Sequence, residues 1–214
     1  MSAIDYQAAV RYLADRDPVL APIIETVGLP TLQPNTNFFG ALASSIVGQQ
    51  LSVKAAAAIR QRLNALMPDG AGLTPAGILA RSIDELREAG LSRPKAAYVI
   101  DLASKVYDGT VNLETIASLD DEAIIAELVQ VKGIGRWTVE MFLIFALNRL
   151  DVLPVDDLGF RNAVRLRYSL NHLPTASELR EIAEPWSPYR SLGTWYMWQS
   201  LKNEPLKTAV AAVC

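Results

Sequence analysis

Two adjacent aspartates, Asp156 and Asp157, are the side chains of this sequence best placed to take part in acid–base chemistry. They follow Pro154, and the apolar spacing after them predicts a helix over residues 158–170. Asp157 is then the natural N-cap of that helix, with Asp156 just outside it. The helix dipole stabilises a carboxylate at this position and fixes its direction, which suits a group that stabilises a cationic intermediate or activates water. The plainer interpretation is that both aspartates only cap the helix.

A glycine-containing turn precedes the aspartates by about twenty residues. Helical spacing over residues 123–131 ends just before Gly133 and Gly135, which can take positive φ and let the chain reverse sharply. The next helix is expected to begin near Arg136, where free backbone N–H groups would form a site for a phosphate group flanked by Lys132 and Arg136. A plain helix–helix corner is the alternative interpretation.

The helix that follows this turn is apolar on nearly all sides, which is typical of a buried central helix. Met141, Phe142 and Phe145 are therefore predicted to belong mainly to the core. Trp137 differs, because it lies in the first helical turn beside the expected phosphate site. A large aromatic side chain there could stack on a base that has left a nucleic-acid duplex.

The segment V-K-G-I-G-R-W-T, followed by P-V-D-D-L-G, resembles the helix–hairpin–helix DNA glycosylase superfamily. Within that superfamily it is most similar to the DNA-3-methyladenine glycosylase II branch. The resemblance places the catalytic aspartate at Asp157, because the interval from Trp137 then needs no gap. Relatives that excise oxidised bases carry a V-D just after a proline, which would favour Asp156 instead. We expect Asp157 to be catalytic and keep Asp156 as the alternate.

Two further segments extend the resemblance over nearly the whole chain. G-Q-Q-L-S resembles the helix junction that enters the DNA minor groove, so Gln50 is the expected wedge and Gln49 its neighbour; ordinary surface glutamines are the alternative. W-x-P-[aromatic]-R-S places Tyr189 in the base pocket with Trp137. The other tryptophans, Trp198 among them, are predicted to pack in the core. Met141 and Leu158 stand where some relatives carry aromatic pocket residues, which implies a roomier pocket.

The resemblance also implies a reaction. Bifunctional members of the superfamily carry a nucleophilic lysine where Trp137 stands, so this chain is expected to remove bases with water alone and to leave an abasic site. The expected substrate is double-stranded DNA that contains alkylated purines, and no cofactor is implied. A glycosylase for oxidised, deaminated or mismatched bases and a non-catalytic helix–hairpin–helix DNA-binding protein are the alternatives. We expect a monomer and a compact form without the amino-terminal β domain of longer relatives.

Composition limits the other possibilities. The chain has 214 residues, of which 50% are hydrophobic, and no apolar run is long enough to span a membrane, so a cytoplasmic location is expected. Its single cysteine, Cys214, excludes the four-cysteine iron–sulfur cluster of endonuclease III relatives, and no metal site is expected. The net charge of −3 argues mildly against a nucleic-acid partner, but residues 161–214 contain seven Lys and Arg against four Glu.

No convincing strand pattern is present, so the predicted fold is all-α. Two helical lobes are expected, one formed by residues 38–150, which include the hairpin, and one by residues 1–37 with 151–214. The cleft between them is expected to carry Asp157 on one wall and Trp137 on the other. Ser177 is predicted to cap a helix over 175–184, and an amphipathic helix is predicted over 192–201. Lys95 is interpreted as a solvated side chain or a phosphate contact.

Overall fold

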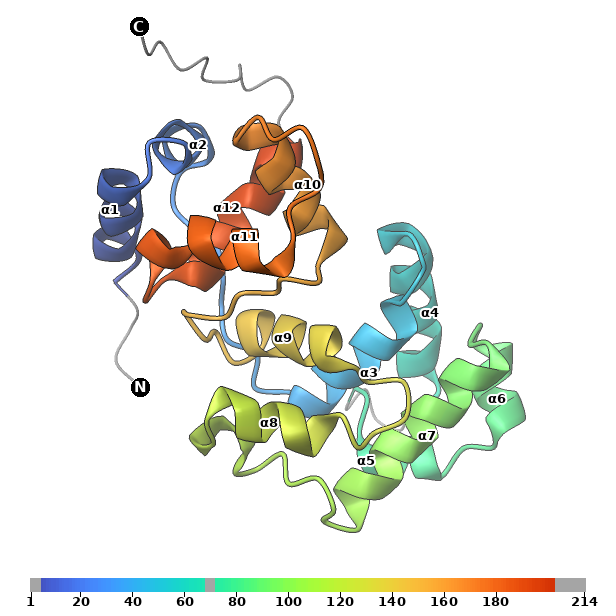
Figure 1. Ribbon diagram of the computed structural model, residues 1–214. Helices are drawn as coiled ribbons and strands as arrows, with labels where there is room; N and C mark the ends of the chain where they lie inside the picture. Colours follow the sequence, from blue (N-terminus) through green and yellow to red (C-terminus); the bar gives the residue numbers. More distant parts are fainter. Residues whose placement is uncertain (1–4, 68–71, 203–214) are drawn as a thin grey trace, which may run out of the picture. The chain divides into compact units, whose positions relative to one another are not determined.

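The computed structural model describes residues 5–67 and 72–202, and within these residues all regular secondary structure is helical. The all-α prediction is therefore confirmed for the described part of the chain. Contacts divide the chain into two compact units: the first unit comprises residues 1–33 and 148–214, and the second unit comprises residues 34–147 (Figure 1). The sequence had suggested 38–150 for the second of these. Cys214 lies outside the described residues.

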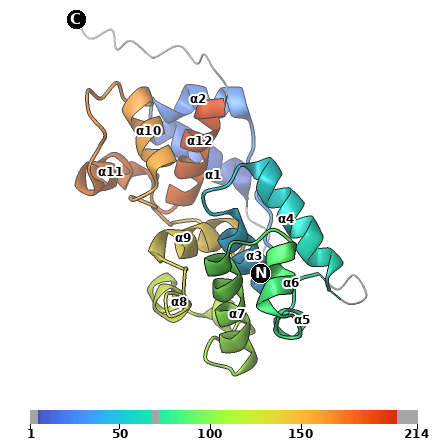
Figure 2. The ribbon, with the colours of Figure 1, turned by 90° about the vertical axis from the view of Figure 1, so that its right-hand side faces the viewer.

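The second unit is built from short helices whose starts are encoded locally. They are α3 (Phe38–Gly48), α4 (Val53–Ala65), α5 (Pro75–Leu79), α6 (Ile83–Glu88), α7 (Arg93–Tyr107), the 3₁₀ turn η2 (Ile116–Ser118), α8 (Asp121–Leu128) and α9 (Arg136–Phe145). Most begin with a short polar side chain that accepts from the backbone N–H three residues on. These caps are Asn37, Ser52, Thr74, Ser82, Ser92 and Asp120. Helix α7 packs against α3, α5 and α6, and α9 packs against α3 and α8 (Figure 2).

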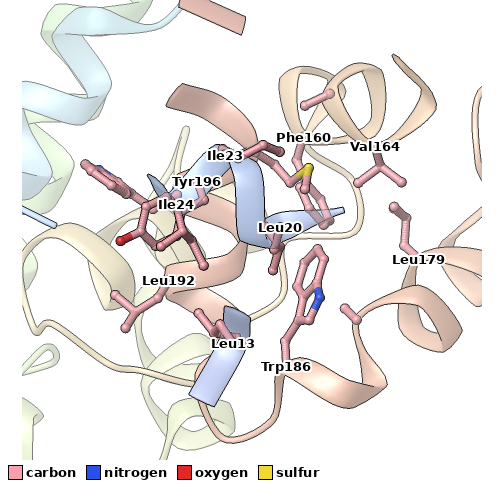
Figure 3. Packing of buried hydrophobic residues seen from close by; sticks show 14 of the residues in the cluster. Leu13, Leu20, Ile23, Ile24, Phe160, Val164, Leu179, Trp186, Leu192 and Tyr196 are labelled. Atoms are coloured by element: carbon pink, nitrogen blue, oxygen red, sulfur yellow. The ribbon is translucent and has the colours of Figure 1, made fainter. Parts of the chain in front are cut away.

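The first unit joins the two ends of the described chain. Its helices are α1 (Tyr6–Arg16), α2 (Leu20–Val27), α10 (Leu158–Arg167), α11 (Ala176–Ile182), the 3₁₀ turn η3 (Glu184–Trp186) and α12 (Arg190–Lys202). Figure 3 shows their apolar side chains converging on one core, in which Leu20, Phe160 and Trp186 are fully buried. Because this core holds α10 and α12 together, it also positions the first turn of α10.

Helix α12 differs from its prediction. The sequence suggested an amphipathic helix, but residues 191–197 are all buried. The physical reason is that α2 and α10 both pack on α12, so that little of its surface remains in contact with water. Two of the residues buried in this way, Ser191 and Thr194, are polar.

A buried carboxylate ties the helices of the first unit together. Asp17 accepts hydrogen bonds from the backbone N–H groups of Val19 (2.8 Å) and Leu20 (3.1 Å) at the start of α2. Its other oxygen accepts from Nε1 of Trp186 (2.6 Å) and from the hydroxyl of Tyr168 just after α10. Burial and the adjacent carboxylate raise the pKa of the Tyr168 hydroxyl, which stays a donor. Asp17 thereby links α1, α2 and η3 to the end of α10.

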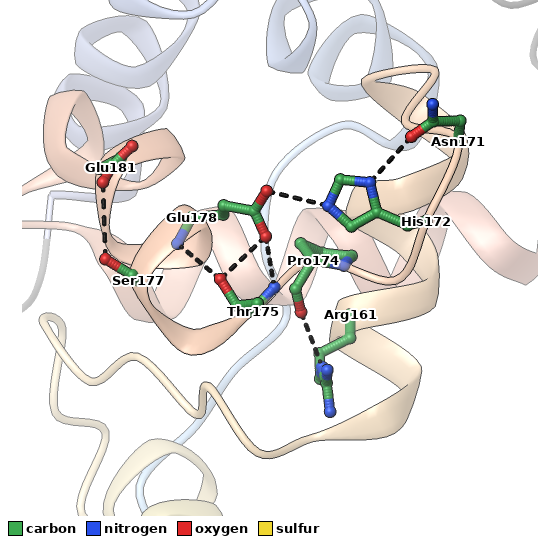
Figure 4. Close-up of polar contacts among 8 residues, drawn as sticks. All are labelled: Arg161, Asn171, His172, Pro174, Thr175, Ser177, Glu178 and Glu181. Carbon is green, nitrogen blue, oxygen red and sulfur yellow. Dashed lines mark hydrogen bonds and ion pairs between the residues drawn. The ribbon is translucent and has the colours of Figure 1, made fainter.

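Helix α11 is capped by Thr175, so the prediction of Ser177 was wrong. Thr175 and Glu178 form a reciprocal capping box, and His172 adds a contact to the same carboxylate at 2.9 Å (Figure 4). In the same region the Arg161 guanidinium donates to the carbonyl of Pro174 (3.0 Å), which fastens this loop to α10. These contacts shape the segment between α10 and α11.

Candidate active site

The carboxylate of Asp157 lies at the start of α10, as the sequence predicted. Asp157 is the N-cap, and its Oδ1 accepts a hydrogen bond from the backbone N–H of Phe160 at 2.6 Å. The side chain is half-buried, whereas the neighbouring Asp156 is exposed. The N-cap contact fixes the direction of the Asp157 carboxylate and directs the positive end of the helix dipole toward it.

A second donor reaches the same oxygen from α12. Nε1 of Trp198 donates to Oδ1 of Asp157 at 2.8 Å, so the assignment of Trp198 to packing alone was wrong. Nothing in the local pattern around Trp198 indicates this role, because the two residues meet only through the packing of α12 on α10. Gly159 lies beside the pair, and a Cβ at this glycine would stand 3.2 Å from Oδ1 of Asp157. The carboxylate is therefore oriented from the backbone of its own helix and from a neighbouring helix.

The hairpin between α8 and α9 contains one left-handed glycine rather than two. Gly133 has φ of +80° and lies against the ring of Tyr98, where a Cβ would come within 2.3 Å of the ring. Gly135 has φ of −101°, so the prediction of positive φ was wrong for it. One reversal at Gly133 suffices, and Gly135 is the N-cap of α9, where it gives no side-chain cap because glycine has no side chain. Ile134 between them is buried. The start of α9 thus presents first-turn N–H groups without a capping side chain, which suits an anion.

The two predicted cations of the hairpin differ in their surroundings. Arg136 forms ion pairs with Glu122 and, at 3.3 Å, with the buried Glu140. Its hydrogen bond with Glu122 raises the pKa of the guanidinium. Lys132 has 74% of its side chain exposed, and its Nζ lies 4.0 Å from Asp101. Lys132 is therefore the more accessible of the two for a phosphate.

A pocket of about 600 Å³ opens in the second unit between the end of α3 and the start of α9. Its lining consists of Ser45, Gly48, Gln49, Gln50, Leu51, Trp137, Thr138 and Met141. Four residues singled out from the sequence for base or groove contacts therefore share one pocket. Its volume falls in the range of small-molecule sites.

Two side chains of α9 that were predicted to belong to the core, Met141 and Phe145, are less buried than expected. Phe145 is 44% exposed, and Trp137, which the sequence set apart from the core, is 43% exposed at the pocket. Phe145 and the half-buried Met141 line a smaller adjoining hollow of about 150 Å³. The helix turns Phe142 and its neighbours inward against α3 and α8, which leaves this edge uncovered. Met141 thus lies at the pocket wall rather than deep in the core.

The turn after α3 is held by contacts with the hairpin and with α7. Gln50 is exposed and has φ of 56°, and Nε2 of Gln49 donates to the carbonyl of Gly133 at 2.9 Å. The ammonium of Lys95 donates to the carbonyls of Val47 (2.8 Å) and Gln49 (2.6 Å), so its interpretation as a solvated side chain was wrong. Partial burial lowers the pKa of Lys95.

The remaining predicted pocket residues belong to the first unit. Leu158 is 61% exposed at the start of α10, next to Asp157. The Tyr189 ring packs edge-to-face on Tyr12, with ring centroids 5.2 Å apart. Asp151, bonded to Arg190 at 2.6 Å, fixes the backbone that carries Tyr189. The pocket roles of Leu158 and Tyr189 stay predictions.

Over residues 5–67 and 72–202, no group of three His, Cys, Asp or Glu side chains is arranged to hold a metal ion. No helix of these residues has the length and apolar character needed to cross a membrane.

Comparison with known protein families gives a clear match. The family described as "HhH-GPD superfamily base excision DNA repair protein" matches residues 43–188, a range that includes the hairpin, Trp137 and Asp157. Among curated proteins, DNA-3-methyladenine glycosylase 1 of Schizosaccharomyces pombe is 38% identical over 162 residues, which cover 75% of this chain and 71% of that protein.

Solved structures agree with this match. The 3-methyladenine DNA glycosylase Mag1 of Schizosaccharomyces pombe, solved in complex with abasic DNA, aligns with a TM-score of 0.84 at 33% identity and covers 92% of this chain and 98% of that one. A DNA-3-methyladenine glycosidase of Bacillus halodurans aligns with a TM-score of 0.78 at 34% identity, covering 90% of this chain and 88% of that one.

Proposed function

Because the chain belongs to the HhH-GPD superfamily of base excision DNA repair proteins, we propose that it is a monofunctional DNA glycosylase that excises alkylated purines from duplex DNA. The substrate class is that of 3-methyladenine, and the product is an abasic site. The observation that carries the proposal is the carboxylate of Asp157, oriented by the Phe160 N–H and the Trp198 indole. The similarity to relatives named DNA-3-methyladenine glycosylase supports the choice of substrate.

The proposed reaction needs from the protein mainly a negative charge that is correctly positioned near the sugar. Alkylation at a ring nitrogen makes the purine cationic, so the bond between the sugar C1′ and the base nitrogen breaks with the electron pair leaving on the base. The sugar becomes an oxocarbenium ion, water adds at C1′, and one proton is released. Asp157 would stabilise the cation through its negative charge or accept the proton of the water. Trp137 offers no amine, so no covalent intermediate with the sugar forms at that position.

The pocket of the second unit is the proposed site for the extruded base. The exposed face of Trp137 can attract a cationic purine through its π system, and Met141 adds an adaptable apolar wall. The hydroxyls of Ser45 and Thr138 offer hydrogen bonds to ring edges. We propose that Leu158 and Tyr189 of the first unit contact the damaged nucleotide on which Asp157 acts.

The DNA backbone and the vacated base position have their own proposed contacts. The backbone of Gly133 and Gly135 and the ammonium of Lys132 would hold a phosphate, with Arg136 beside them. Gln50 would enter the minor groove as the wedge, since it is exposed at the tip of its turn, and Gln49 would support it through its bond to the hairpin. We further propose that the protein acts as a cytoplasmic monomer and carries no iron–sulfur cluster.

The test is base release from methylated double-stranded DNA by the wild type, Asp157→Asn and Asp156→Asn. Both substitutions remove one negative charge at adjacent positions, so each controls for the other. Release of alkylated purines without strand cleavage, abolished only by Asp157→Asn while DNA binding persists, is the expected result. Loss confined to Asp156→Asn would move the catalytic role by one residue. Binding without release by the wild type would refute the alkylated-purine assignment, and duplexes with oxidised, deaminated or mismatched bases would be tested next.

A further inference from the structure

One face of α7 carries three side chains that each hold a segment of the proposed DNA-contacting surface. From this arrangement we infer that Lys95, Tyr98 and Asp101 are positioning residues that hold the Gln49–Gln50 turn and the Gly133 hairpin in register. The inference rests on the proposed function, because it assumes that the turn and the hairpin must be held in a fixed relative position in order to contact DNA. None of the three residues is placed in the reaction itself.

The spacing of these residues puts them on one side of the helix. They follow one another at intervals of three within the 15-residue helix α7, so their side chains project from neighbouring turns of the same face. Helix α7 is itself anchored by α3, α5 and α6. A rigid helix with a row of contacts can therefore act as a common support for two loops that are distant in the sequence.

Lys95 supports the turn after α3. Its Nζ donates to the carbonyl oxygens of Val47 and Gln49, at 2.8 and 2.6 Å. Carbonyls in the last turn of a helix lack intrahelical partners and form the negative end of its dipole, so an ammonium there satisfies two of them and complements the dipole. The Gln49 carbonyl belongs to the peptide that leads into Gln50, whose φ of 56° is uncommon for a residue with a side chain. Lys95 thus holds the backbone that presents the proposed wedge.

Tyr98 and Asp101 support the hairpin. Asp101 accepts from the backbone N–H of Lys132 at 2.9 Å and from Nζ of Lys105 at 2.8 Å. Although partial burial acts to raise the pKa of Asp101, the hydrogen bonds from Lys105 and Lys132 lower it, so the carboxylate stays charged. The Tyr98 ring fills the space against Gly133 that any Cβ would occupy. The hairpin is therefore held next to α7 by a charged hydrogen bond and a close ring contact.

A direct bond joins the two supported loops. Nε2 of Gln49 donates to the carbonyl of Gly133 at 2.9 Å. The turn after α3, the Gly133 hairpin and α7 are thereby each in contact with the other two. A displacement of the turn would therefore also displace the hairpin. If the hairpin holds a phosphate while Gln50 fills the vacated base position, these contacts set the spacing between the two.

The decisive variant is Lys95→Met, which keeps the apolar stem and removes the ammonium. Its matched control is Arg62→Met, because the Arg62 guanidinium also donates to a backbone carbonyl of the second unit, that of Ala89 at 2.8 Å. Lys95→Met should lower the single-turnover rate of base release and the preference for an abasic-site duplex over an undamaged one by about tenfold each. Arg62→Met should change neither by more than about twofold at a similar unfolding midpoint.

A measurement without DNA keeps the inference separate from the proposed function. The amide of Leu51, bonded to the carbonyl of Gly48 at 3.1 Å, closes the turn, so its hydrogen exchange should become about tenfold faster in Lys95→Met. Should the wild type release no base and show no preference for abasic DNA, the proposed function fails while this exchange measurement still tests the role of Lys95. Unchanged exchange at Leu51, or equal losses in Lys95→Met and Arg62→Met, would overturn the inference.

Chemical rescue covers the case in which loss of the ammonium unfolds the turn. Lys95→Cys alkylated with 2-bromoethylamine regains an ammonium at the length of a lysine side chain. Restored base release, abasic-site preference and Leu51 protection support the inference. Wild type treated in the same way controls for alkylation of the natural cysteine, Cys214. The inference would be contradicted if the alkylated Lys95→Cys variant were folded and still failed to regain base release, abasic-site preference and Leu51 protection.

Discussion

Replacement of Trp198 by phenylalanine removes the indole N–H that binds Asp157 but keeps an aromatic ring on α12. The lost contact is a 2.8 Å hydrogen bond to a charged oxygen. Hydrogen bonds to charged groups contribute about 1.5–3 kcal/mol, and the contact is partly buried, so we expect about 2 kcal/mol of lost unfolding free energy. The N-cap bond from Phe160 remains, which keeps Asp157 at the start of α10.

Catalysis should suffer more than folding. With one orienting donor gone, the carboxylate can rotate away from the position where the sugar cation develops, and a misplacement of about 1 Å costs on the order of a hundredfold in rate. We therefore expect single-turnover release of alkylated purines by Trp198→Phe to fall about 10- to 100-fold, while binding to an abasic-site duplex changes little. The assay is base release from methylated duplex DNA, with chemical denaturation measured on the same samples.

The matched control is Trp195→Phe, three residues earlier on α12. The Trp195 ring packs against Tyr196, with centroids 5.0 Å apart, and is buried. This variant should lose stability through the smaller ring yet keep the excision rate of the wild type. Equal excision rates for Trp198→Phe and wild type, or losses that track stability alike in both variants, would show that the indole N–H does not orient Asp157.

Two further predictions concern the hairpin and the dependence of protein stability on pH under acidic conditions. Gly133→Ala should destabilise the protein by about 2 kcal/mol or more, since alanine disfavours the φ of +80° and its Cβ would meet the Tyr98 ring at 2.3 Å. Gly135→Ala should be tolerated, because φ there is −101° and the space is open, and chemical denaturation of the two variants decides the point. The hydrogen bonds from Thr175, together with His172, lower the pKa of Glu178 from 4.5 to about 2. A lowered carboxyl pKa contributes stability that is fully present above pH 4.5 and is lost as the pH falls toward 2. Glu178→Gln should therefore flatten the pH dependence of the unfolding free energy between these pH values. A carboxyl titration by NMR that placed the pKa of Glu178 near 4.5 would contradict this reasoning.

Local sequence signals were sufficient for several parts of the site. The N-cap role of Asp157, the helix start at Arg136 and the left-handed glycine at position 133 were all expected before the fold was known. Each depends on residues within about one helical turn, where capping and φ preference decide the conformation. The same holds for the all-α character, which follows from hydrophobic periodicity.

Contacts between distant segments were not accessible in the same way. The bond from Trp198 to Asp157 spans 41 residues, and those from Lys95 to the turn after α3 span 46 and 48. A lysine or tryptophan on a helix has the same local pattern whether its polar end meets water, a carbonyl or a carboxylate. The burial of α12 on all sides likewise depended on which helices pack around it.

The sequence by itself thus determined the all-α character, the helix starts at Asp157 and Arg136, the position of the hairpin and the identity of the chemically capable residues, because these properties are set by short-range backbone preferences. Only the tertiary structure decided which side chains hold those residues in place. Trp198 orients the Asp157 carboxylate, and Lys95 and Asp101 support the turn and the hairpin, through helix packing that brings remote residues within hydrogen-bond distance.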